Sequence, residues 1–200
     1  MTAFSVPAGR LLTVADYLAL PETDERIELQ GGSLVRSPSP KPHHQKCMVR
    51  LVERLGAQLP PILDVVPDVD VDLERATPDA PGYVRAPDVA VATLDGVQRV
   101  EREGGVLRAS DVVLAIEILS PGSARIDRTL KRAEYADAGI PHYWLVDISD
   151  RPSLVALPPG RRVRVRGRVA GDRCVRHRRT VPDPHRPRPA RLVVTARPVG

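Results

Sequence analysis

Short stretches in which apolar and polar residues alternate are the main signal along the chain, and this period of two predicts strands. In residues 65–73, three valine or leucine positions alternate with three aspartates. Residues 111–119 form the most apolar run and predict a central strand. Gly31 and Gly32 separate two alternating stretches and predict a hairpin, because a tight turn there needs positive φ. The predicted strands are 26–30, 33–36, 65–73, 87–92, 111–119 and 142–147.

Two longer stretches carry apolar residues at helical spacing. Residues 43–59 predict an amphipathic helix that Pro60 ends, and residues 124–138 predict a second helix that Gly139 closes. A short helix begins at Thr13, with Asp16 placed for a capping box. Residues 37–42 and 74–86 are predicted loops, and residues 95–109 are predicted to be a loop or a short irregular element. Strands mixed with two main helices indicate an α/β or α+β fold.

Charged residues are unevenly distributed along the chain, which has 200 residues and a formal net charge of +5. Residues 158–200 contain 13 arginines and two aspartates but neither lysine nor glutamate, a charge of +11, so residues 1–157 carry −6. We therefore predict one domain over 1–157 and a basic Arg/Pro-rich tail over 158–200. Within the tail, 161–169 could form a very basic strand, and the rest is typical of an unfolded segment.

Several protein classes are excluded by composition. No apolar run approaches the ~20 residues that cross a bilayer, and the N-terminus lacks the apolar core of a secretory signal. Cys47 and Cys174 are too few for a disulfide framework. The sequence predicts a cytoplasmic protein with no membrane partner.

Three charged residues are candidates for chemistry. Glu117 lies in the most apolar strand, where a carboxylate is costly unless it is paired, exposed or bound to a cation; alternatively, it reaches water at the strand end. Asp88 begins another strand, although a Pro-Asp pair alone is typical of turns. Two carboxylates on adjacent strands suit Mg²⁺, which could activate water against a phosphodiester. Lys131 could stabilise charge on the phosphoryl group, or lie on a solvated helix face.

These residues belong to longer motifs that resemble a known family. The motifs are Pro87-Asp88, residues 115–123 and 131–147, and, nearer the N-terminus, residues 13–21, 26–29 and 37–44. Over residues 12–154 the chain resembles the Uma-two family of bacterial restriction endonucleases, in the PD-(D/E)XK nuclease superfamily. The resemblance implies a restriction-endonuclease-like fold, with a mixed central sheet flanked by helices.

The resemblance also implies roles for site residues. Asp88 and Glu117 would be the metal carboxylates, with the carbonyl of Ile118 as third ligand and Mg²⁺, or Mn²⁺ in its place, as cofactor. Lys131 would replace the lysine that most of the superfamily carries two residues after the glutamate. Glu28 matches an N-terminal acid that contacts a second metal or orients water.

His44 has two interpretations, as a residue near this site or as an ordinary helix-start residue. The tail departs from the family, which normally ends in further apolar elements. An Arg/Pro-rich sequence of this kind is what a GC-rich gene gives out of frame, so we hypothesise a frameshift near residues 155–160. Sequencing the 3′ end of the gene tests this.

The leading functional hypothesis is a Mg²⁺-dependent endonuclease that acts on DNA, with a homodimer expected because cutting both strands needs two sites. The first alternative is a non-catalytic nucleic-acid-binding protein whose basic tail follows phosphates. The second is a degenerate, inactive family member.

Overall fold

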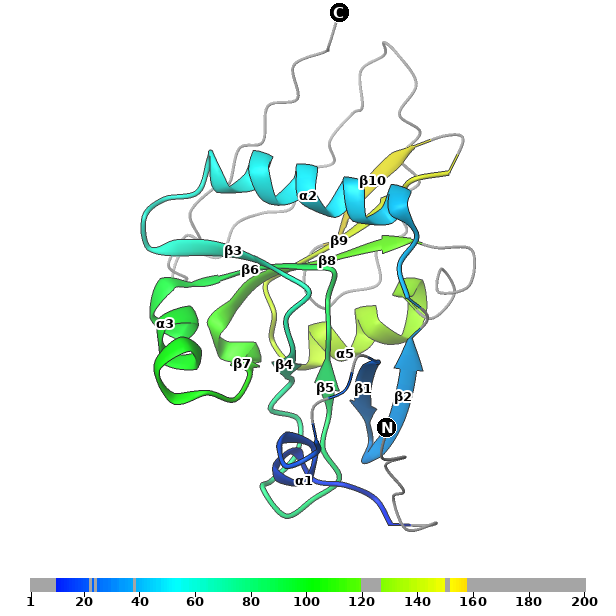
Figure 1. Cartoon of the computed structure of the whole chain (residues 1–200), viewed down its shortest axis with the longest axis vertical. Coiled ribbons are helices and arrows are strands. Elements are labelled where there is room, and N and C mark those ends of the chain that lie inside the picture. Colours follow the sequence, from blue (N-terminus) through cyan, green and yellow to red (C-terminus); the bar gives the residue numbers. More distant parts are fainter. Residues whose placement is uncertain are drawn as a thin grey trace, which may run out of the picture. The chain divides into compact units, whose positions relative to one another are not determined.

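Two five-stranded sheets, each with parallel and antiparallel pairs, form the framework (Figure 1). The structure is a computed structural model that describes residues 10–21, 23, 25–37, 39–119, 127–149 and 152–157. The main sheet has the order β10 (Ser153–Leu157), β9 (His142–Asp147), β8 (Val112–Leu119), β6 (Val89–Thr93) and β3 (Leu63–Pro67). The small sheet has the order β2 (Ser33–Ser37), β1 (Arg26–Gln30), β5 (Val84–Arg85), β4 (Val71–Asp72) and β7 (Leu107–Arg108).

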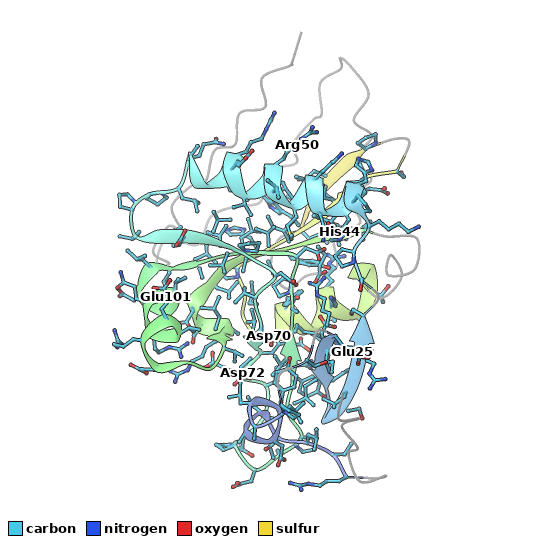
Figure 2. The ribbon with its side chains drawn as sticks, viewed as in Figure 1. Glu25, His44, Arg50, Asp70, Asp72 and Glu101 are labelled. Carbon is cyan, nitrogen blue, oxygen red and sulfur yellow. The ribbon has the colours of Figure 1, made fainter. Side chains whose placement is uncertain are left out.

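One face of the main sheet is covered by α2 (Pro42–Gly56), which confirms the longer helix predicted near the N-terminus. Its inner face packs on a buried cluster to which β6 contributes Val89 and Val91, β8 contributes Leu114 and Ile116, and the helix contributes Leu55. Figure 2 shows His44 on the side of α2 that faces the strands and Arg50 on the opposite side. The helix therefore has an inner face that packs on the sheet and an outer, polar face.

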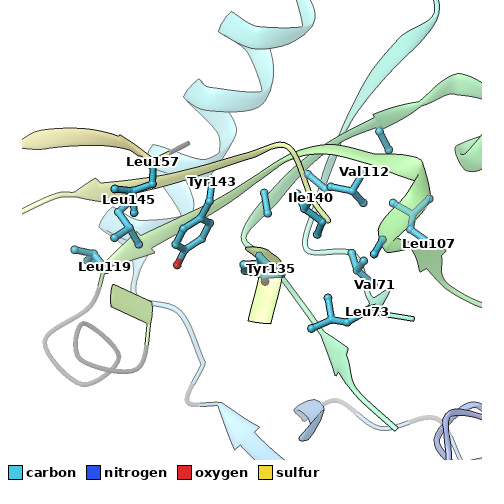
Figure 3. Packing of buried hydrophobic residues seen from close by; sticks show 14 residues of the cluster. Val71, Leu73, Leu107, Val112, Leu119, Tyr135, Ile140, Tyr143, Leu145 and Leu157 are labelled. Atoms are coloured by element: carbon cyan, nitrogen blue, oxygen red, sulfur yellow. The ribbon is translucent and has the colours of Figure 1, made fainter. Parts of the chain in front are cut away.

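The opposite face of the main sheet packs on a larger apolar cluster (Figure 3). Tyr135 of α5 (Arg132–Asp137) lies in it, with its ring centroid 5.2 Å from that of Tyr143 on β9. Ala115 and Leu119 of β8 belong to the same cluster. Since side chains alternate along a strand, Glu117 shares this face and is enclosed by it.

The predicted strand over 65–73 is wrong, because the structure divides it between the two sheets. β3 ends at Pro67, and Asp68 adopts a positive φ of 46° that breaks the extended path. β4 then pairs with β5 and β7 in the small sheet. Valine and aspartate do alternate over these residues, but the chain bends at Asp68, and the alternation gives no sign of that bend.

The predicted loop or short irregular element over 95–109 is also wrong, because α3 (Leu94–Glu103) lies there. Thr93 caps this helix by accepting a hydrogen bond from the N–H of Gly96 at 3.2 Å. Val97 and Val100 pack against the larger apolar cluster. A Cβ at Gly96 would lie 2.7 Å from the side chain of Asp111, so glycine is needed there for packing.

The remaining predictions have mixed outcomes. The capping box of α1 (Val14–Leu18) is confirmed. The mixed α/β class is also confirmed, and the structure adds a second sheet and three strands that were not predicted, β5, β7 and β10. The predicted helix over 124–138 is described from residue 127 as a π-helical turn (Asp127–Lys131) followed by α5. The tail predictions for 158–200 lie outside the described residues. Among the described helices, none has the length and apolar content to cross a membrane.

The predicted Gly-Gly hairpin is confirmed by φ values of 54° at Gly31 and 80° at Gly32, between paired β1 and β2. A Cβ at Gly32 would lie 2.7 Å from the Cβ of Leu11. We expect Gly32→Ala to lower the free energy of unfolding by about 1–3 kcal/mol, measured by urea unfolding. Gly105→Ala is the matched control. Gly105 has a similar φ of 84°, but a Cβ added there would meet nothing within 4 Å. An equal loss in both variants would contradict the steric explanation.

Candidate active site

Asp88 immediately precedes β6 and lies beside β8, where it accepts the N–H of Ile118, the residue next to Glu117. β6 and β8 run antiparallel, with Val89 opposite Ile116, and one further step in that register brings Asp88 opposite Glu117. Both carboxylates are buried, with 3% of each residue exposed. Directly opposite residues of an antiparallel pair share a face of the sheet, so the ladder itself places both acids together.

Asp88 is held by three donors from different elements. The guanidinium of Arg26 donates to its Oδ1 at 2.9 Å, and the N–H of Ile118 donates to its Oδ2 at 2.6 Å. Nε2 of His44 lies 3.2 Å from the same Oδ2. Burial raises the pKa of Asp88, but the bond from His44, the charge of Arg26 and the Ile118 N–H outweigh it, and the net pKa lies below its ordinary value. Asp88 is thus an anion at neutral pH.

Among the described residues, Lys131 and Tyr135 both hold Glu117. Lys131 Nζ lies 2.9 Å from Glu117 Oε1, and the hydroxyl of Tyr135 donates to the same oxygen at 2.9 Å. Burial, and then the charge of Glu117, raise the pKa of the Tyr135 hydroxyl well above its usual range. Tyr135 therefore stays protonated and remains a hydrogen-bond donor to the carboxylate.

Glu28 joins this pair from the small sheet. Its Oε1 lies 3.0 Å from Lys131 Nζ and accepts the N–H of Ala86 at 3.0 Å. Lys131 thus bridges Glu28 and Glu117, one carboxylate from each sheet. Burial raises the pKa of Glu28, but Lys131, the Ala86 N–H and Arg85 together bring it below the ordinary value.

Arg85 extends the bridge to α5. Its Nη1 lies 2.9 Å from Glu28 Oε2, and its Nε lies 2.6 Å from Glu134 Oε2. Only 1% of Arg85 is exposed, and both partners are buried. An alternating series of charges therefore runs through the interior in the order Glu134, Arg85, Glu28, Lys131 and Glu117. We call this series the charge chain.

Comparison with known proteins assigns this arrangement to a family. A sequence model of the Uma2 (Uma-two) family, described as "Putative restriction endonuclease", matches residues 14–192. The chain belongs to the Uma2 family. The matched range continues past Leu157 into the Arg/Pro-rich segment, beyond the motifs that carry the sequence resemblance.

A solved structure has the same fold as this Uma2 chain. It is the crystal structure of "a putative nuclease belonging to DUF820" from Anabaena variabilis ATCC 29413, with a TM-score of 0.62 and 21% sequence identity over 76% of this chain and 82% of that one. No curated protein matches the chain. Family and fold together place the chain among restriction-endonuclease-like nucleases and make it an endonuclease by class.

The four predicted catalytic residues of this Uma2 member come together in space, joined through the charge chain and the β6–β8 ladder. Glu28 and Lys131 touch directly, as do Lys131 and Glu117, and Asp88 accepts the N–H of the residue that follows Glu117. Ile118, predicted as a ligand through its carbonyl, uses its N–H to fix Asp88. Among the described residues, no group of three or more His, Cys, Asp or Glu side chains is placed to hold a metal. The catalytic and metal-binding roles of the predicted site residues stay predictions.

Sequence reasoning missed some of the residues that build the site and left one open. His44, which had two interpretations, is buried against Asp88, and the bond to that carboxylate raises its pKa. Arg26 and Tyr135 were not singled out, although both lie within quoted motifs. Arg85 lies in a segment rich in proline and glycine, and its place three residues before Asp88 was the one available signal.

The depressed pKa values of Glu28 and Asp88 predict acid sensitivity. Each carboxyl stabilises the fold fully above its unfolded-state pKa, near 4.5 and 3.8, and loses that contribution as the pH falls through the lower folded-state value. We expect the free energy of unfolding to fall below about pH 5, by up to about 1.4 kcal/mol per pH unit for each group. Urea unfolding between pH 7 and pH 3 measures this loss.

The Glu28→Gln variant should flatten this acid dependence, because one of the two groups no longer titrates. Glu101→Gln is the matched control, since Glu101 is an exposed residue on α3 (Figure 2). Equal pH dependence in the parent and in Glu28→Gln would rule out Glu28 as a source of the acid sensitivity.

Proposed function

We propose that this Uma2 protein is a DNA endonuclease that hydrolyses phosphodiester bonds with the help of Mg²⁺ or Mn²⁺. The observation that carries the proposal is the place of Asp88, bonded to the N–H next to Glu117 on β8, with Lys131 Nζ 2.9 Å from Glu117. Two carboxylates and a cation at one position match what phosphoryl transfer requires, a site for a divalent metal and a positive group for developing charge.

The donor set fits a hard divalent cation. Asp88 and Glu117 supply carboxylate oxygens, and the carbonyl of Ile118 lies on the strand next to Glu117; Mg²⁺ prefers oxygen ligands and keeps several waters. The pKa of Asp88 below its ordinary value keeps it in the anionic form that binds cations. We propose these three residues as the ligands. When bound, the metal supplies charge neutralisation and an activated water.

The chain's own residues hold and orient the reacting groups in this proposal. The ammonium of Lys131, fixed between Glu28 and Glu117, offers donors to the phosphoryl oxygens that gain charge. The hydroxyl of Tyr135 orients Glu117 through its hydrogen bond. Arg26 holds Asp88 from the opposite side. Each ligand therefore has a fixed direction before substrate arrives, which lowers the cost of reorganisation.

Cleavage of supercoiled plasmid tests the proposal. The full chain should nick or linearise plasmid DNA with Mg²⁺ and should lose this activity in excess EDTA. The double variant Asp88→Ala/Glu117→Ala should be inactive, while an Arg102→Ala control on α3 should match the parent. Cleavage by the double variant at the parent's rate would refute the assignment of both ligands.

We further propose a homodimer acting on cytoplasmic DNA, because a cut through both strands needs two sites. Sedimentation of the full chain at several concentrations tests the dimer, and a monomer that linearises plasmid in one binding event would contradict it.

A further inference from the structure

The outer face of α2 carries a row of basic side chains at intervals of four residues, Lys46, Arg50 and Arg54. Residues four apart lie above one another on a helix, so the three form a line along it. All three are exposed, and within the part of the chain that the structure describes none has an ion-pair partner. Figure 2 shows Arg50 on the side of α2 away from the strands. We call these three residues the basic row.

Three other exposed arginines among the described residues are neutralised locally. Arg10 lies 2.7 Å from Asp16, and Arg36 and Arg102 each lie 2.8 Å from a neighbouring glutamate. The basic row therefore sets three cations without described counter-charges in one line, in the part of the chain (residues 1–157) whose sequence carries a net charge of −6. A cluster of unpaired cations on an acidic domain creates a local positive potential.

A hollow of about 420 Å³ lies along the basic row. Its wall on α2 includes the basic row and His43, and its other wall includes Ile148, Ser149 and Pro152 beyond β9. None of its lining residues is acidic. Much of its surface is apolar, with Cys47 and Leu51 among its lining, so the basic row supplies the charge that an anionic chain would meet there, with no carboxylate beside it.

A second, larger hollow has the opposite character. It has a volume of about 910 Å³, and its charged lining is Arg26 with the four acids Glu25, Asp68, Asp70 and Glu103. This acidic lining repels phosphate groups. Of these two hollows, only the one along α2 suits a polyanion.

The basic row is connected to the candidate active site through α2 itself. His44, in the first turn of the helix, contacts Asp88 on the inner side, and Lys46 is exposed only two residues later. A DNA strand that follows the basic row toward the first turn of α2 is thus led toward Asp88, one of the proposed metal ligands. From Lys46 to Arg54 the helix rises about 12 Å, over which one strand of duplex DNA carries three to four phosphates.

We propose that Lys46, Arg50 and Arg54 form the surface on which the backbone of duplex DNA docks. This inference rests on the proposed function and adds to it the face by which substrate approaches. The contacts are to phosphates, so the surface would set affinity and its salt dependence but would not select a sequence.

DNA binding by the full chain tests the proposal. The binding of a labelled DNA duplex is measured in EDTA, so that no cleavage occurs, while the salt is raised from about 50 to about 200 mM. The triple variant Lys46→Gln/Arg50→Gln/Arg54→Gln should show a salt slope that is shallower by about 2–3. Over this range the parent should therefore lose about 40-fold more affinity than the variant.

Two further variants make the test specific. Arg10→Gln/Arg36→Gln/Arg102→Gln removes the same charge from paired arginines and should leave the slope unchanged. Glu53→Gln removes the single acid of α2, which is exposed, and should tighten binding. An unchanged slope in the basic-row variant, or an equal loss in both triple variants, would overturn the proposal and would mean that total charge or the tail carries binding.

The docking surface and the proposed function can fail separately. If the parent binds duplex DNA through the basic row but never cleaves plasmid, the docking surface stands and the nuclease proposal falls. If the parent cleaves with Mg²⁺ but the basic-row variant binds DNA as the parent does, the docking surface falls alone.

Discussion

Replacement of Arg85 by methionine is expected to lower the free energy of unfolding by about 3–5 kcal/mol. Arg85 is fully buried and is an ion-pair partner of both Glu28 and Glu134, at 2.9 and 2.6 Å. Methionine fills much of the same volume, so the main loss is the cation, which leaves two buried carboxylates facing an apolar group. Urea unfolding at neutral pH measures the loss.

A second variant shows that charge and not packing causes this loss. Glu28→Gln/Arg85→Met/Glu134→Gln removes the cation and both carboxylates together, and we expect it to recover at least half of the lost stability. Where Arg85→Met yields no folded protein, folding of the triple variant supports the same conclusion. Arg102→Met, at an exposed ion pair with Glu103, is the control and should change stability by no more than about 1 kcal/mol. An Arg85→Met variant as stable as this control would refute the account.

Loss of Lys131 is expected to have the second large effect, on cleavage. We expect Lys131→Met to reduce the rate of plasmid cleavage by about 10²–10³-fold, because it removes the positive group proposed to stabilise developing charge. The quantity measured is the single-turnover rate with saturating enzyme. Arg132→Met is the matched control, because Arg132 is the next basic residue on the same segment. Cleavage at the parent's rate by Lys131→Met would remove Lys131 from the mechanism.

The same variant should respond more strongly to metal. Lys131 bridges Glu28 and Glu117, so its removal leaves these two carboxylates close together without their shared cation. A divalent ion at the neighbouring site would then relieve repulsion as well as bind its ligands. We expect Mg²⁺ to raise the melting temperature of Lys131→Met by more than it raises that of the parent, measured by thermal shift.

The sequence was sufficient for the parts of the site that lie on regular elements. The apolar run over residues 111–119 identified β8 and the unusual place of Glu117 within it, and the start of β6 identified Asp88. Their proximity follows from strand pairing, because the register of β6 and β8, continued by one residue, sets those positions opposite each other. The family motifs added Glu28 and Lys131, which no local pattern distinguishes from ordinary charged residues.

The elements that were missed are short or locally ambiguous. β5 has two residues within a segment rich in proline and glycine, so its Arg85 showed no periodicity. α3 does carry helical spacing at Leu94, Val97 and Val100, with Thr93 as cap, but its charged residues and Gly96 resembled a loop. Tertiary contacts decide both cases, since Asp111 fills the space beside Gly96 and two carboxylates stabilise the buried Arg85.

The charge chain has a consequence for synthesis of the protein. Its members come from β1, β5, β8 and the segment from Lys131 to Glu134, so they are made at widely separated times. A growing polypeptide that has just left the ribosome up to Leu119 contains Asp88 and Glu117, but not yet Lys131 or Tyr135. The donors that hold Asp88 are all present by then, but Glu117 acquires its fixed direction only when the later segment folds back onto the sheet. Chains that end before Lys131 therefore lack part of the site, and under the proposed function they would not cleave DNA before translation has passed that segment.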